Sequence, residues 1–152
     1  MRHRIAAGVL LEHDGKILLV RHLKAGAYDF WVAPGGGAEG QEDLRDAARR
    51  EVREECGLLI EPLQIAYIEE FCQPGQRECK VWFTARWIGG TLDATAIEAT
   101  REHIVEAAFL DRADFDGKTI FPPVLADGQY WRDQAAGFAF PKYLGVREMA
   151  FY

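Results

Sequence analysis

The chain has 152 residues, of which 49% are hydrophobic and 28% charged; this composition excludes a disordered chain and predicts one globular domain over residues 1–152. Its formal net charge is −6 and it has no run of Lys or Arg, which argues against a polymeric nucleic acid as partner. No stretch approaches the roughly 18 apolar residues of a membrane helix, and charge interrupts the N-terminus before a signal peptide is complete, so we expect no membrane association and a cytoplasmic location.

The N-terminal region predicts strands. Apolar runs at 4–12 and 16–22 flank the turn residues 13–15 and indicate a β-hairpin. A further apolar run at 30–33 precedes a proline and three glycines at 34–37. These glycines are expected to end regular structure and to let two backbone segments approach closely.

A helix is predicted for 41–56, because Gly57 supplies the left-handed residue that commonly ends a helix. Two long strands, 59–71 and 80–88, follow around a turn at Pro74-Gly75 and are expected to pair antiparallel.

The C-terminal part is less regular. Residues 89–102 are ambiguous, whereas 104–110 is predicted as the final strand. Two prolines, Pro122 and Pro123, are expected to open a helix that continues to Ala135 before Gly137.

The three cysteines, Cys56, Cys72 and Cys79, lack the spacing of a zinc site. Cys72 and Cys79 could face each other across a hairpin. Free thiols are favoured over a disulfide, because a reducing compartment is expected.

The predicted helix has an unusual inner face. At about 100° per residue, acidic side chains continue its apolar stripe (Leu44, Ala47, Ala48, Val52) toward the C-terminal end: Glu51, Glu54 and Glu55. Like charges at this spacing repel, and the negative end of the helix dipole lies beside them, so the arrangement costs stability unless a cation binds. A hard divalent ion, Mg²⁺ first and Mn²⁺ second, suits such carboxylates. The alternative is a surface helix with Glu–Arg pairs.

One motif covers the glycine loop and this helix. Its nine specified positions match the Nudix box, G-x5-E-x7-R-E-U-x-E-E-x-G-U, without a gap: Gly36, Glu42, Arg50, Glu51, Val52, Glu54, Glu55, Gly57 and Leu58. The chain resembles Nudix hydrolases over roughly 4–125, including the hairpin, the Trp31-x-x-Pro-Gly-Gly segment and 106–115. The resemblance implies an α/β fold, a Nudix-type α/β/α sandwich with a mixed β-sheet, in which a loop–helix–loop holds the metal.

The resemblance also implies roles for individual residues. Gly36 is grouped with the metal ligands Glu51, Glu54 and Glu55, and Gly57 is structural. Glu54 and Arg50 are expected at the catalytic centre, where Arg50 orients a ligand glutamate.

Four further acidic positions are candidates for supporting roles at this site. Glu42 is expected to form an ion pair with an arginine, in preference to direct ligation, and Glu39 to contact metal-bound water. Glu102 and Glu106 are the candidates for the general base, and for each a solvated loop residue is the alternative.

The implied activity is Mg²⁺- or Mn²⁺-dependent hydrolysis of a diphosphate linkage in a small nucleotide. Substrate candidates are a nucleoside diphosphate sugar such as ADP-ribose, a nucleoside triphosphate or a dinucleoside polyphosphate. Alternatives are a non-catalytic nucleotide-sensing module and an isoprenoid diphosphate isomerase-like enzyme, which would need a reactive cysteine. Homodimers are frequent in the family.

Substrate readout is expected from outside the motif. Aromatic residues that could stack on a base are Phe30, Trp31, Tyr67, Phe71 and Trp82, although strand aromatics more often belong to the core. Candidate phosphate contacts are Arg21, His22, Lys24 and Arg77. The segment 121–123 resembles one that in some members precedes a purine-reading asparagine, but Val124 and Leu125 follow here.

Overall fold

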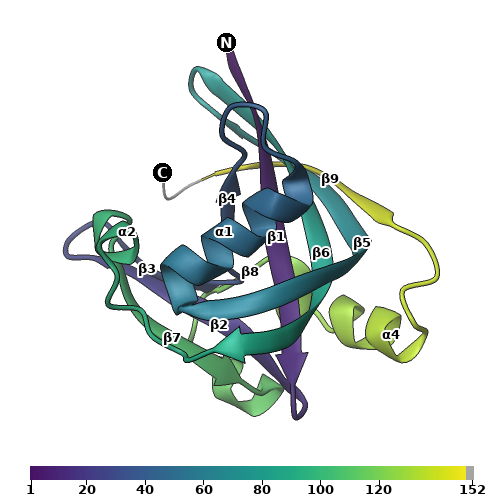
Figure 1. Ribbon diagram of the computed structural model, residues 1–152. Coiled ribbons are helices and arrows are strands. Elements are labelled where there is room, and N and C mark those ends of the chain that lie inside the picture. The colour runs from purple at the N-terminus through teal and green to yellow at the C-terminus, as the bar shows by residue number, and fades with distance from the viewer. Residues whose placement is uncertain (150–152) are drawn as a thin grey trace.

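The computed structural model describes residues 1–149, so the last three residues of the predicted domain lie outside it. Its strands are β1 (Arg2–His13), β2 (Lys16–Lys24), β3 (Tyr28–Val32), β4 (Gly35–Gly37), β5 (Leu58–Gln73), β6 (Gln76–Gly90), β7 (Ile104–Leu110), β8 (Ile120–Phe121) and β9 (Lys142–Glu148). Its helices are α1 (Leu44–Cys56), α2 (Ile97–Arg101), α3 (Pro123–Ala126), α4 (Gln129–Ala135) and a 3₁₀ turn, η1 (Arg112–Phe115). Figure 1 shows their order along the chain.

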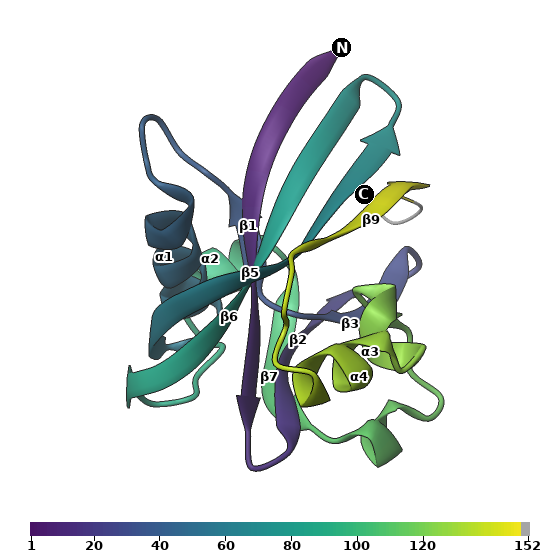
Figure 2. The ribbon, with the colours of Figure 1, turned by 90° about the vertical axis from the view of Figure 1, so that its right-hand side faces the viewer.

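The strands form one curled, mixed sheet in the order β8-β3-β2-β1-β6-β5-β9, with β4 added to β1 and β7 to β2. The pairs β1–β6, β3–β8 and β5–β9 are parallel, and the remaining pairs are antiparallel. Helices α1 and α2 cover one face, and α3 and α4 lie on the other (Figure 2). The predicted α/β/α arrangement with a mixed sheet is confirmed.

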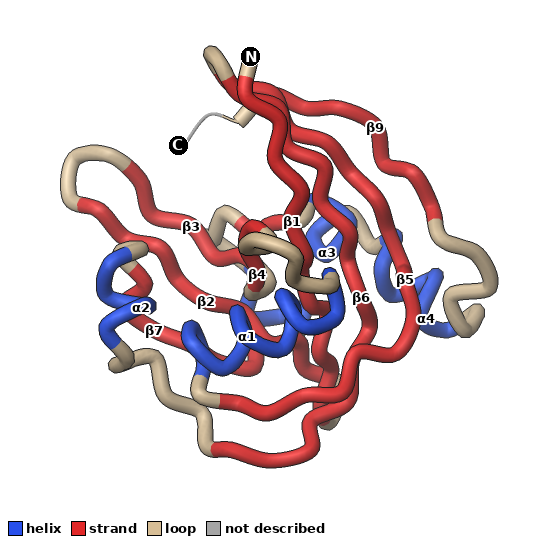
Figure 3. The backbone as a smooth tube through the Cα atoms, turned by 45° about the horizontal axis from the view of Figure 1, so that its top comes forward, coloured by secondary structure: helices blue, strands red, loops and turns tan. Residues whose placement is uncertain are grey.

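The predicted hairpin is present, but its two strands soon separate. The turn places Asp14 (φ 52°) and Gly15 (φ 75°) in the left-handed region, as a tight hairpin turn requires. Beyond two residue pairs next to this turn, β1 instead runs parallel to β6 from Arg2 to Leu11. The two halves of the sheet therefore diverge from the turn, as Figure 3 shows.

Apolar residues fill both faces because successive side chains of a strand point to opposite sides. On β1, Val9 and Leu11 pack in a cluster with Val52 of α1. Leu10 between them joins the opposite cluster, which includes Leu125 of α3. Both helical layers are thus held by the same central strand.

Several predicted boundaries need correction. Residues 35–37 do not end regular structure; they pair with Ala6, Ala7 and Gly8 of β1. The expected close approach is confirmed, since a Cβ on Gly35 would lie 2.3 Å from the Ala7 carbonyl oxygen. Helix α1 starts at Leu44 and not at 41, because the Asp43 side chain caps it by accepting from the Arg45 N–H at 2.7 Å.

The C-terminal predictions also differ from the structure. The predicted helix up to Ala135 is two short helices, because Gly128 adopts φ 89° between them. Strand β7 matches its prediction but is not the last, since β8 and β9 follow. The antiparallel pairing of β5 with β6 is confirmed, and Gly57 (φ 73°) ends α1 as predicted.

The cysteines are free, as expected. Cys56 is buried, and the register opposes Cys72 to Arg77 and Cys79 to Glu70, so the two strand cysteines do not face each other directly. Within residues 1–149, no helix has the length and apolarity needed to cross a membrane.

Substitution of Gly57 should destabilise the fold more than substitution of Gly26. Both glycines have φ near +73°, where an alanine costs about 1–2 kcal/mol. A Cβ on Gly57 would also lie 2.5 Å from the Thr91 carbonyl oxygen, whereas a Cβ on Gly26 would meet nothing within 4 Å. Urea unfolding should therefore show a larger loss for Gly57→Ala than for Gly26→Ala, and equal losses would contradict this account.

Candidate active site

Helix α1 turns carboxylates toward the protein interior. Glu51 and Glu55 are only 6% and 2% exposed and share the buried face with Ala48 and Val52. Glu54 is partly exposed at the edge of that face. The inward orientation predicted from the helical period is confirmed for the first two glutamates and is partial for Glu54.

Arg50 connects the acidic residues of this region. Its guanidinium forms a two-pronged ion pair with Glu42, at 2.8 and 2.9 Å, and donates to Glu51 at 2.9 Å. It also donates to Glu54 at 3.2 Å, and Glu39 lies 3.6 Å away. The predicted ion pair between Glu42 and an arginine is therefore present. Arg50 lowers the pKa of Glu42 and holds the other carboxylates in fixed positions.

The glycine loop fits closely around these carboxylates. A Cβ on Gly36 would lie 2.5 Å from Oε1 of Glu51, so a side chain at this position would displace the carboxylate. The Gly35 N–H donates to Oε1 of Glu55 at 3.4 Å. Strand β4 thus forms a cradle for the inward face of α1.

Burial and mutual repulsion disfavour the charged forms of these carboxylates. Burial, with Glu51 and Glu102 adding repulsion, raises the pKa of Glu55 well above its usual range. Burial also raises the pKa of Glu54 and Glu102. Within residues 1–149, no three acidic, histidine or cysteine side chains already surround a common point in the manner of a closed metal site. The donor set, carboxylates and no sulfur, nevertheless fits a hard divalent cation that would relieve the repulsion.

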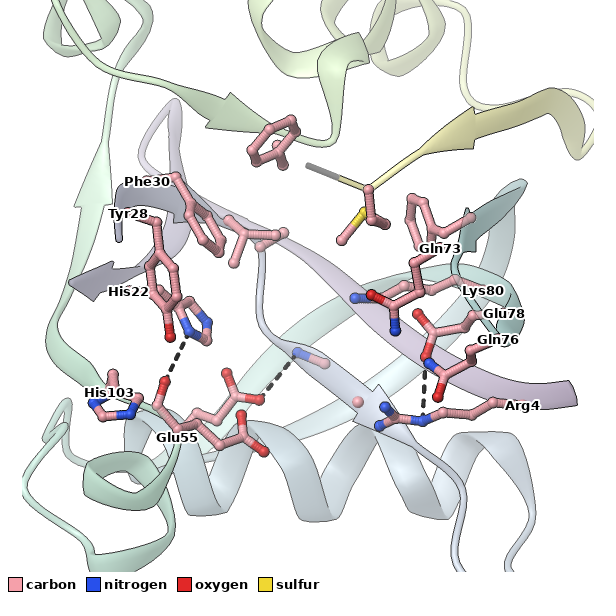
Figure 4. Close-up of a pocket in the computed structure, with 18 of the residues that line it drawn as sticks. Arg4, His22, Tyr28, Phe30, Glu55, Gln73, Gln76, Glu78, Lys80 and His103 are labelled. Carbon is pink, nitrogen blue, oxygen red and sulfur yellow. Dashed lines mark hydrogen bonds and ion pairs between the residues drawn. The ribbon is translucent and has the colours of Figure 1, made fainter. Parts of the chain in front are cut away.

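A pocket of about 440 Å³ opens above Glu55. Figure 4 shows Glu55 at its floor, with Tyr28, Phe30 and His22 on one side and Gln73 and Lys80 on the other. The pocket lies where the two halves of the sheet diverge from β1. It can hold a ligand that reaches from the carboxylates to the far ends of β5 and β6.

The structure separates the two candidates for the general base. Glu102 lines this pocket, and its charge raises the pKa of Glu55. After burial, the charges of Glu51 and Glu54 raise the pKa of Glu102 in turn. Glu106 lies elsewhere, in a second hollow, with its carboxylate 3.8 Å from Arg21. Arg21 is itself paired with Asp29 at 2.7 Å. Geometry therefore favours Glu102.

Only some of the predicted substrate contacts line this pocket. The aromatic residues Phe30, Phe71 and Trp82 line the pocket, whereas Trp31 and Tyr67 do not. Trp31, Tyr67 and Trp82 all belong to the core cluster that includes Leu10 and Leu125. The residues expected to contact phosphate also separate: His22 lines the pocket, and Arg21, Lys24 and Arg77 do not.

Residues that were not predicted complete the lining. They come from strand ends far from the motif: Arg4, Gln73, Gln76, Glu78, Lys80, Arg147 and Met149. Alternation along β6 places Gln76, Glu78 and Lys80 on one face, a signal that the sequence contained. For β9, the apolar pair Leu144 and Val146 was the available indication of a strand.

The curled mixed sheet between helices and the inward carboxylates define an α/β protein with an acidic site of the type that binds a hard cation. The model of the NUDIX domain matches residues 1–127. This chain belongs to the Nudix family.

Comparison with individual proteins agrees with this family assignment. The chain is 33% identical over 108 residues to an 8-oxo-dGDP phosphatase of Danio rerio, covering 71% of this chain but only 32% of that relative. It is 27% identical over 131 residues to an ADP-ribose pyrophosphatase of Methanocaldococcus jannaschii, covering 85% of this chain and 75% of the relative. A Nudix hydrolase structure from Nitrosomonas europaea superimposes with a TM-score of 0.74 at 24% identity, covering 92% and 93% of the two chains, and supports the fold.

Replacing Arg50 by lysine should weaken the fold and the site, because a lysine cannot make the two-pronged bond to Glu42 while also holding Glu51. We expect the free energy of unfolding to fall by about 2 kcal/mol in urea titrations. Arg49→Lys is the matched control, since Arg49 makes only partly exposed ion pairs with Asp46 and Glu61. Its change should stay within about 0.5 kcal/mol, and equal losses for the two variants would count against the role of Arg50.

Acid should destabilise the protein through His22. Burial lowers the pKa of His22 to about 4, with smaller contributions in the same direction from Lys80 and His103. The hydrogen bond that its Nδ1 donates to the Glu102 carbonyl oxygen at 3.0 Å acts in the opposite direction. As the pH falls, the unfolded chain therefore protonates His22 at a higher pH than the folded protein does. The stability that depends on the neutral His22 is fully present above about pH 6.5. As the pH falls toward 4, the free energy of unfolding decreases by up to about 3 kcal/mol from this group.

His22→Asn isolates this effect, because the amide keeps an N–H donor but does not titrate. Urea unfolding between pH 7.5 and 4 should show the wild type losing more stability than the variant. Other groups with raised pKa, such as Glu102, are common to both proteins and cancel in the difference. A difference between the two proteins that does not change with pH would refute the assignment.

Proposed function

We propose that this protein is a Mg²⁺-dependent hydrolase, with Mn²⁺ as the second choice of metal, that cleaves the diphosphate linkage of a nucleotide. The observation that carries this proposal is the pair of buried carboxylates, Glu51 and Glu55, of which Glu55 lines a pocket of about 440 Å³. Water would add to one phosphorus, and a nucleoside monophosphate and a second phosphate-bearing fragment would leave.

The residues of α1 would hold the cation. Glu51, Glu54 and Glu55 supply its carboxylate oxygens, and Gly36 leaves the space that Glu51 occupies. Arg50 orients Glu51 and Glu54, and Glu42 fixes Arg50 in turn. When bound, the metal would neutralise the diphosphate and lower the pKa of the attacking water.

The remaining steps fall to other residues of the pocket. Glu102 would accept the proton from the attacking water, because it lines the pocket beside Glu55. Lys80 and Arg101 also line the pocket and would contact the negatively charged phosphates. Gly57 keeps its structural role at the end of α1.

The nucleotide class is supported by the relatives, whose names refer to 8-oxo-dGDP, ADP-ribose and, in Caulobacter vibrioides, RNA. None of the three cysteines, all within the described residues, lines the pocket, which weighs against isomerase chemistry. A cytoplasmic location and a homodimer stay predictions.

The deciding experiment is a substrate panel. ADP-ribose and other nucleoside diphosphate sugars, nucleoside di- and triphosphates, dinucleoside polyphosphates and a 5′-triphosphorylated RNA are incubated with Mg²⁺, with Mn²⁺ and with chelator. Products are identified by mass. We expect a nucleoside monophosphate from at least one small nucleotide, with metal only.

Glu54→Gln and Glu55→Gln should each lower the activity by about a hundredfold or more. Glu61→Gln, on the exposed partner of Arg49, is the matched control and should retain it. A nucleotide that raises the melting temperature of the wild type but stays intact would instead indicate a sensing module.

A further inference from the structure

Two buried polar atoms at one end of the pocket lack hydrogen-bond partners. Among the described residues, the side-chain atoms in this situation are Oε1 of Gln73 and Nε of Arg147. Both residues line the pocket. The Nε of Arg147 forms an ion pair with Glu69 at 3.5 Å, so the atom that points to a ligand is Oε1 of Gln73, because buried polar groups are nearly always satisfied.

Arg147 presents a planar guanidinium group that contacts two aromatic rings. Its guanidinium carbon lies 4.4 Å from the ring centre of Phe71 and 4.9 Å from that of Phe121. Glu69, which is 2% exposed, lies 3.5 Å from the Arg147 Nε and accepts from the Trp82 indole at 2.9 Å. The Glu69 carboxylate offsets the charge of Arg147. Arg147 therefore offers a ligand oriented N–H donors more than a net positive charge.

The strand register separates this corner from the carboxylates. Arg147 of β9 is opposite Phe71, which is opposite Glu78. Gly36, which contacts Glu51, is opposite Ala7, and Ala7 is opposite Val81 of β6. Three residues along β6 correspond to about 10 Å. This leaves room for a sugar between a diphosphate at Glu55 and a group at Arg147.

A planar base suits this corner better than a second phosphate does. Aromatic rings flank the guanidinium, an amide with an unsatisfied carbonyl lies in the same pocket, and Glu69 already compensates the charge. Arginine donates in a fork to two adjacent acceptors, and O6 and N7 of guanine are such a pair. The neighbouring N1–H of guanine is the donor that Oε1 of Gln73 lacks.

We propose that Arg147 and Gln73 are specificity-determining residues that select a 6-oxopurine nucleotide, of the guanine or hypoxanthine type, over adenine. Adenine presents an N6 donor to Arg147, which has no acceptor, and an N1 acceptor to Gln73, which would have to turn its amide to donate. This inference rests on the proposed function, because it assigns the base of the same substrate. It also gives a role to β9, which lies beyond the residues 1–127 that the family model matches.

The test compares nucleotides that differ only in the base. Guanine, hypoxanthine, 7-deazaguanine and adenine forms of the best-cleaved nucleotide class are ranked by kcat/KM. We expect guanine and hypoxanthine to exceed adenine by about tenfold or more, and loss of N7 to cost about tenfold. Arg147→Lys, which keeps the charge beside Glu69, should lower the guanine-to-adenine ratio toward one.

Two further variants sharpen the result. Gln73→Met keeps the side-chain length but removes the acceptor for N1–H, so it should lower the same ratio. Arg77→Lys is the control, because Arg77 pairs with Glu70 at 3.0 Å outside the pocket and should leave the ratio unchanged. Melting curves check that each variant is folded.

The same comparison is made by equilibrium binding to Glu54→Gln with Mg²⁺, so base selection is measured even if no nucleotide is cleaved. Absence of cleavage with tighter guanine binding would overturn the proposed hydrolysis but support this inference. Equal binding and cleavage of guanine and adenine forms by the wild type, or a parallel loss of both in Arg147→Lys, would overturn it.

Discussion

The contact between Arg50 and the surrounding carboxylates is the interaction on which the acidic site depends. A buried helix face that carries Glu51 and Glu55 cannot be stable on hydrophobic packing alone, because desolvated like charges repel. Arg50 offsets part of that repulsion, and Glu42 holds the arginine in a two-pronged ion pair. The remaining excess of negative charge is what makes the site receptive to a cation.

The second constraint is the course of β1. This strand starts in a hairpin with β2 but continues beside β6, so the sheet opens on one side of it. Glu55 lies at the floor of this opening, and alternate side chains of β5 and β6 line its far wall together with Arg147 of β9. One division of the sheet would therefore separate the proposed phosphate chemistry at one end from the proposed base recognition at the other.

Local features of the fold followed from the sequence because they depend on neighbouring residues. The period of α1 placed Glu51 and Glu55 beside Val52, and Gly57 marked the end of the helix. The sequence did not reveal that Asp43 caps α1 two residues after Gln41, or that Gly128 interrupts a helix. Capping and breaking compete with helix propensity over one turn, and only the final backbone shows which prevails.

The sequence by itself determined the family, the mixed α/β class and the identity of the acidic residues, since a gapless motif fixes their spacing on one helix. Only the tertiary structure decided which distant residues meet them. It brought Glu102 to the pocket and left Glu106 beside Arg21, and it added Arg147 from the last described strand. Pairing between remote strands sets these neighbours, and no local pattern encodes that register.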